Sequence, residues 1–86
     1  MTKHILIIDD ELDIQAVAQL ALQAVAGWNV SIASSGSEGV AIALKTPPDA
    51  ILLDVMMPDM DGIMTLQVLQ AHPETERIPV ILMTAK

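Results

Sequence analysis

Four short apolar segments, separated by stretches with helical spacing, most restrict what this chain can fold into. They occupy residues 4–8, 29–33, 50–54 and 80–84. Segments of four or five residues rich in Ile, Leu and Val are typical of β-strands rather than buried helices. Because these strands are apolar along most of their length, both faces of the sheet are expected to be covered, as in parallel sheets.

The stretches between these segments predict three helices. Residues 12–26 follow helical spacing and end at Gly27, which is a frequent helix terminator. The apolar residues at this spacing are Ile14, Val17, Ala18, Ala21 and Val25. The motif "SGSE" forms a capping box that begins a second helix over 35–45. Asp61 can cap a third helix that extends to about residue 71. The polar stripe of the first helix consists of Gln15, Gln19 and Gln23.

The order of the predicted elements indicates an α/β protein with a doubly wound parallel sheet. Strands alternate with helices, which implies right-handed crossovers and helices on both faces of the sheet. A chain of 86 residues can form only one domain, and no internal repeat divides it.

Composition excludes several classes of function. The absence of cysteine excludes disulfides and thiolate metal sites. A net charge of −7 and the absence of Tyr and Phe argue against direct binding of nucleic acid, but suit a cation or a basic partner. No apolar run approaches the roughly 18 residues of a membrane span. The N-terminus lacks a signal-peptide pattern, so we expect a cytoplasmic protein without membrane insertion.

Acidic residues follow two of the predicted strands. Asp9 and Asp10 come directly after the first strand, Asp54 ends the third, and Thr84 ends the fourth. In open α/β sheets, sites form outside the carboxyl ends of the strands, so these side chains are expected to meet at one edge. Three carboxylates repel one another unless a cation lies between them, and Mg²⁺ suits such oxygen ligands.

The same residues also have purely structural interpretations. Asp54 could be a turn or capping residue, Asp9 and Asp10 could cap the first helix, and Thr84 could be an ordinary strand residue. Asp61 is the better helix cap, and Asp9 and Asp10 are predicted at the same edge of the sheet as Asp54. The site is therefore the favoured interpretation.

The motifs "IIDDE", "LLDVMMPDMDG" and "MTA" resemble the receiver (CheY-like) domain of two-component response regulators. The resemblance covers all 86 residues in order. It implies a flavodoxin-like fold in a truncated (βα)3β form that lacks the last strand and the last two helices. Residues 1–86 would then be a single, C-terminally incomplete receiver-like domain. The resemblance implies a signalling domain rather than an enzyme that acts on external substrates.

The resemblance also implies a role for individual residues. Asp54 matches the phosphoacceptor, which takes a phosphoryl group from a histidine kinase or a phosphotransfer protein. Asp9 and Asp10 match the acidic pair that holds Mg²⁺ together with Asp54. Met56 matches the position whose main-chain carbonyl completes the metal site, and Thr84 matches the switch residue whose hydroxyl turns toward the phosphoryl group.

Two alternatives remain open from the sequence. Without a fifth strand and its phosphoryl-binding lysine, the predicted strand 80–84 becomes an apolar edge, and part of the first helix loses its neighbour. We therefore expect a homo-oligomer formed through that edge or that helix face, and the chain could be a self-associating fragment without signalling. A phosphatase of the haloacid dehalogenase type is disfavoured, because Met56 occupies the place of its second acid.

Overall fold

Strands and helices alternate along the chain, as the sequence predicted. The computed structural model describes residues 2–57 and 61–83. In chain order the elements are β1 (His4–Ile8), α1 (Leu12–Ala26), β2 (Asn29–Ala33), α2 (Gly36–Lys45), β3 (Ala50–Asp54), α3 (Gly62–Ala71) and β4 (Val80–Met83). None of the described helices combines the length and apolar character needed to cross a bilayer.

The four strands form one parallel sheet in the order β2-β1-β3-β4. The first and third strands are therefore hydrogen-bonded neighbours, and the fourth strand extends the sheet beyond β3. In the β1–β3 pair, Ile8 lies opposite Leu53. The next residue along each segment, Asp9 after β1 and Asp54 at the end of β3, therefore lies at the same level. This topology confirms the predicted doubly wound α/β fold.

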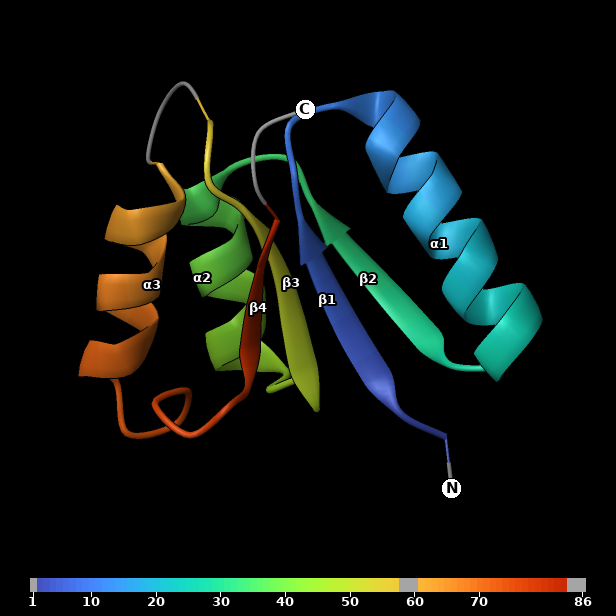
Figure 1. Ribbon diagram of the computed structural model, residues 1–86. Coiled ribbons are helices and arrows are strands. Elements are labelled where there is room, and N and C mark those ends of the chain that lie inside the picture. The colour runs from blue at the N-terminus through green and yellow to red at the C-terminus, as the bar shows by residue number, and fades with distance from the viewer. Residues whose placement is uncertain (1, 58–60, 84–86) are drawn as a thin grey trace.

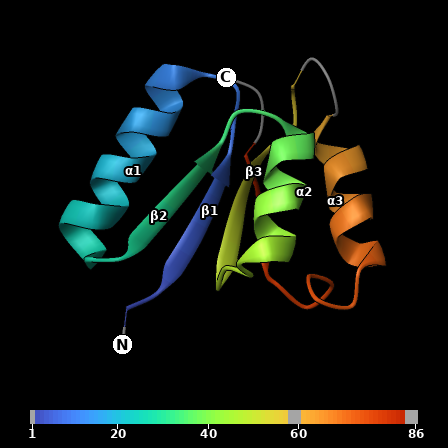
Figure 2. The same cartoon turned by 180° about the vertical axis from the view of Figure 1, so that it is seen from behind.

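Helices lie on both faces of the sheet (Figures 1 and 2). Helices α2 and α3 are adjacent and cover one face, where the main hydrophobic core forms. Helix α1 contacts β1 and β2 from the opposite side. The buried core residues are Leu6, Ile8, Ala33, Ala43, Ile51, Leu53, Met57 and Leu69.

Local signals at the helix ends agree with the sequence, with one difference. The Ser35 hydroxyl accepts a hydrogen bond from the Glu38 N–H, and the Asp61 carboxylate accepts one from the Met64 N–H. Gly27 ends α1 with φ of 67°, a left-handed conformation that glycine adopts without steric cost. The Glu38 carboxylate, however, binds the Ser34 N–H at 2.6 Å, one residue earlier than a capping box requires.

Part of the predicted apolar face of α1 is exposed. Val17 belongs to this face, and its side chain is 68% exposed; the nearby Leu20 is 69% exposed. The reason is that α1 contacts mainly β1 and β2, and no other described helix lies on its side of the sheet (Figure 1). An apolar cavity of about 330 Å³ lies beside it, with Leu22, Leu52 and Ile81 in its lining.

Gly62 allows α3 to begin very close to the end of β3. A Cβ atom at this position would lie 2.5 Å from the Asp54 carbonyl oxygen and 2.6 Å from the Val55 Cα. The Gly62 N–H donates a hydrogen bond to the Val55 carbonyl at 2.9 Å. Because the obstructing atoms belong to the main chain, no side-chain rearrangement can make room for a methyl group.

Replacing Gly62 with alanine should therefore destabilise the fold. We expect Gly62→Ala to lower the free energy of unfolding by about 1–3 kcal/mol, the usual cost of overpacking. Urea unfolding followed by circular dichroism measures this loss. Gln67→Ala, at an exposed position of the same helix, is the control and should leave the free energy nearly unchanged. Equal stability of the two variants would contradict this packing argument.

The outer edge of β4 should promote self-association of the 86-residue chain. Within residues 2–57 and 61–83, no further strand pairs with this edge, and Ile81 and Leu82 are 56% and 39% exposed. Exposed apolar edges tend to pair with other chains. Sedimentation velocity at high micromolar concentration should detect dimers or larger species, which Ile81→Lys should reduce and Gln67→Lys should not. A stable monomer under these conditions would show that the expectation is wrong.

Candidate metal centre

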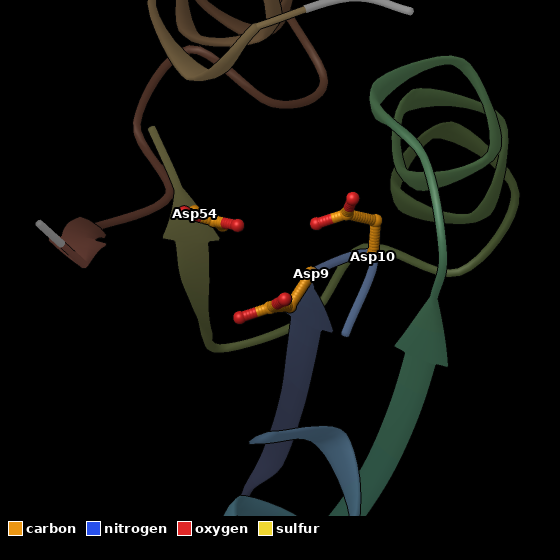
Figure 3. A group of neighbouring side chains, drawn as sticks. All are labelled: Asp9, Asp10 and Asp54. Atoms are coloured by element: carbon orange, nitrogen blue, oxygen red, sulfur yellow. The ribbon is translucent and has the colours of Figure 1, made fainter. Parts of the chain in front are cut away.

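Three aspartates meet at the carboxyl ends of β1 and β3 (Figure 3). Asp54 is the last residue of β3, and Asp9 and Asp10 directly follow β1. One carboxylate oxygen from each residue can be chosen so that all three lie within 4.8 Å of one another. The structure thus brings together the three acids that the sequence singled out. Their proximity follows from the register of β1 and β3, which carries Asp9 and Asp54 to the same level.

Main-chain donors help to hold two of these acids in the protein interior. Asp9 and Asp54 are each only 1% exposed. The Glu11 N–H donates to Asp9 Oδ1 at 2.8 Å, and the Met56 N–H donates to Asp54 Oδ1 at 3.1 Å. In both cases the donor lies two residues after the acid, the short-range contact typical of Asp in turns. These turns orient both carboxylates and offset part of the cost of removing them from water.

Asp10 differs from the other two acids. Its Oδ1 atom is buried and has no hydrogen-bond partner within the described part of the chain. Leaving a buried polar atom unsatisfied costs free energy, and such atoms usually have an explanation. A cation among the three carboxylates would satisfy this oxygen and remove the mutual repulsion. The set of oxygen donors fits Mg²⁺, which prefers hard oxygen ligands.

The structure says less about the other two predicted site residues, Met56 and Thr84. The main chain of Met56 lies beside the Asp54 carboxylate, to which its N–H donates, while the Met56 side chain is 62% exposed. The residues after β3 line a cavity of about 460 Å³, formed by Val55, Met56, Met57 and Asp61. The proposed metal contact of the Met56 carbonyl stays a prediction. Thr84 lies outside the described residues.

Sequence reasoning missed the contact between Gln15 and the acidic turn. Gln15 was assigned to the polar stripe of α1, but it is buried, and its Nε2 donates to the Asp9 carbonyl at 2.5 Å. Gln19 and Gln23 do not share this burial. The available signal was position: among the three glutamines, Gln15 alone lies in the first turn of α1, close in the chain to the acids.

Neither Asp9 nor Asp10 occupies the N-cap position of α1. Glu11 occupies the N-cap position in an extended conformation, without a side-chain cap hydrogen bond. Asp9 Oδ1 instead accepts from the main chain of Glu11, ahead of the helix. The three acids face a common space at the end of the sheet (Figure 3).

Comparisons with known proteins agree with this geometry. The family described as response regulator receiver domain matches residues 5–86. Response regulator PleD of Caulobacter vibrioides is 42% identical over 87 aligned positions, covering 99% of this chain and 18% of PleD. The alkaline phosphatase synthesis transcriptional regulatory protein PhoP of Bacillus subtilis is 38% identical over 86 residues, covering 100% of this chain and 35% of PhoP. The chain thus spans about a third or less of the length of these curated relatives.

Solved structures show the same fold. The N-terminal domain of a response regulator receiver protein from Methanoculleus marisnigri superposes with a TM-score of 0.94 at 40% identity, covering all of this chain and 69% of that one. The receiver domain of sensor histidine kinase PA1611 from Pseudomonas aeruginosa gives 0.93 at 29% identity, covering 100% and 70%. That structure has a magnesium ion coordinated in its active site cleft. From its sequence, its fold and its acidic edge, this chain belongs to the receiver domains of two-component response regulators.

Proposed function

We propose that this receiver domain accepts a phosphoryl group on Asp54, with Mg²⁺ held by Asp9, Asp10, Asp54 and the main-chain carbonyl of Met56. The observation that carries the proposal is the grouping of three carboxylate oxygens within 4.8 Å at the ends of two paired strands. The buried, unpartnered Oδ1 of Asp10 supports a cation at this place. The magnesium ion in the Pseudomonas aeruginosa receiver structure supports its identity.

In the proposed reaction, the donor is a phosphohistidine of a histidine kinase or of a phosphotransfer protein. A carboxylate oxygen of Asp54 attacks the phosphorus and forms a P–O bond, while the P–N bond breaks and its electrons return to the imidazole. Mg²⁺ bound here supplies positive charge that neutralises the equatorial oxygens during transfer.

The chain's own contribution is mainly positioning. The Met56 N–H holds one oxygen of Asp54, which fixes the plane of the carboxylate relative to the incoming group. The turn after β1 holds the Asp9 carboxylate in the same way, through the Glu11 N–H. We further propose that the Thr84 hydroxyl turns toward the phosphoryl group and acts as the switch.

A signalling role is preferred to hydrolysis of external substrates. A phosphatase of the haloacid dehalogenase type needs a second acid two residues after its nucleophile, and this chain has Met56 there. The net charge of −7 suits a partner with a basic docking surface rather than nucleic acid. We propose a cytoplasmic domain that passes its phosphorylation state to other parts of a longer protein or to a partner.

Phosphorylation should occur on Asp54 and require Mg²⁺. Incubation with acetyl phosphate and Mg²⁺ should add one phosphoryl group, detected by intact mass. Asp54→Asn should give no adduct because its amide cannot act as the nucleophile, and EDTA should suppress the wild-type adduct. Asp13→Asn, which removes an exposed acid from α1, is the matched control and should still be modified. A wild-type chain that stays unmodified would point instead to a non-signalling fragment.

Mg²⁺ should raise the thermal stability of the domain. Ligands that bind the folded state preferentially stabilise it, and here binding also relieves repulsion among three acids. We expect millimolar Mg²⁺ to increase the melting temperature of the wild type. Asp10→Asn should melt higher than the wild type in EDTA, but gain less from Mg²⁺. Differential scanning calorimetry makes both comparisons, with Asp13→Asn behaving like the wild type. A full Mg²⁺ response in Asp10→Asn would remove Asp10 from the proposed ligands.

A further inference from the structure

The side-chain amide of Gln15 contacts the main chain of the acidic site, and the reaction described above does not use it. Gln15 is 7% exposed. Its Nε2 donates to the Asp9 carbonyl at 2.5 Å and to the Ser34 hydroxyl oxygen at 3.1 Å. One amide group therefore joins α1 to the turn after β1 and to the turn after β2.

These contacts fix the orientation of the amide. A main-chain carbonyl oxygen can only accept hydrogen bonds, so the NH₂ end of Gln15 must face Asp9. The Ser34 hydroxyl oxygen accepts from the same nitrogen, which has a second hydrogen to donate. Ser34 is itself held, because its N–H donates to the Glu38 carboxylate at 2.6 Å at the start of α2.

The carbonyl that Gln15 binds belongs to the peptide bond between Asp9 and Asp10. This peptide unit is planar, so a donor fixed on its oxygen restricts rotation of the whole unit. The preceding peptide unit, between Ile8 and Asp9, is held as well, because the Asp9 N–H donates to the Ala33 carbonyl at 3.0 Å. The Asp10 Cα is bonded to the nitrogen of this unit, and the Asp10 Oδ1 has no hydrogen-bond partner among the described residues. The main chain thus contributes strongly to where the Asp10 carboxylate lies.

We propose that Gln15 is a positioning residue for the metal centre: it holds the Asp9–Asp10 peptide in the orientation that directs Asp10 toward Asp9 and Asp54. The inference rests on the proposed Mg²⁺ site and assigns part of its affinity to a side chain that does not touch the ion. Partners behind metal ligands typically contribute about 10–100-fold to metal affinity. A purely structural role would instead affect the free energy of unfolding and leave the affinity of the folded protein unchanged.

The test compares Gln15→Met with the wild type, because methionine has a similar length but no N–H donor. Gln19→Met makes the same change one helical turn further along α1 and is the matched control. Ser34→Ala removes the second acceptor of Nε2 at an exposed residue. For each 86-residue protein, isothermal titration calorimetry at a temperature where it is folded gives the Mg²⁺ Kd. Urea unfolding in EDTA gives the stability separately.

A second readout needs no metal. Hydrogen bonding to a carbonyl changes the carbonyl ¹³C shift of its residue and the amide ¹⁵N shift of the next one. In EDTA, Gln15→Met should therefore change the Asp9 ¹³C′ and Asp10 ¹⁵N shifts, while Gln19→Met should not. These two signals report on the peptide unit itself, so they test the positioning step directly.

We expect Gln15→Met to raise the Mg²⁺ Kd about tenfold. Ser34→Ala should give a smaller rise, and Gln19→Met should bind like the wild type. A wild-type Kd in Gln15→Met, even with reduced stability, overturns the inference and leaves the metal site intact. If Gln15→Met does not fold, Ser34→Ala decides, and an unchanged Kd with unchanged shifts overturns the inference. Absence of Mg²⁺ binding in the wild type overturns the proposed function itself, and the wild-type titration alone reveals it.

Discussion

The pairing of β1 with β3 is the constraint on which the acidic site depends. Ile8 and Leu53 are partners in this pair, so the following residues, Asp9 and Asp54, leave the sheet at the same level and on the same face. A slip of one residue would turn Asp54 toward the opposite face, where α2 and α3 pack. The hydrophobic side chains that fix the register thus also fix the distance between two like charges.

Placing those charges together has consequences for the turns that follow each strand. Both acids accept a hydrogen bond from the main chain two residues later, which bends the chain sharply after β1 and after β3. After β3 the chain returns so closely that α3 must begin with a residue without a side chain, Gly62. After β1 the return is secured by the amide of Gln15. The start of α1 and the start of α3 therefore depend on the turns that hold the buried carboxylates, and not only on capping side chains.

The sequence predicted the elements and the meeting of the acids because both depend on strong local patterns. Short apolar segments, a glycine stop after α1 and the Asp61 cap each determine one feature over a few residues. The burial of individual helix positions was less predictable. Val17 has apolar helical spacing and is exposed, whereas Gln15 belongs to the predicted polar stripe and is buried. Both depend on how α1 lies across the sheet, which is a tertiary property that helical spacing does not contain.

The apolar cavity on the α1 side has a practical consequence through Trp28, which contributes to its lining. The chain has no other aromatic residue, so its intrinsic fluorescence comes entirely from this indole. Trp28 precedes β2 and shares the cavity with Lys3 and Asp49, so it lies toward the amino ends of the strands and away from the carboxyl ends where the acids meet. Emission from this single fluorophore therefore senses hydration of the open side of the sheet, and it offers a spectroscopic view of that surface independent of ion chemistry at the opposite end.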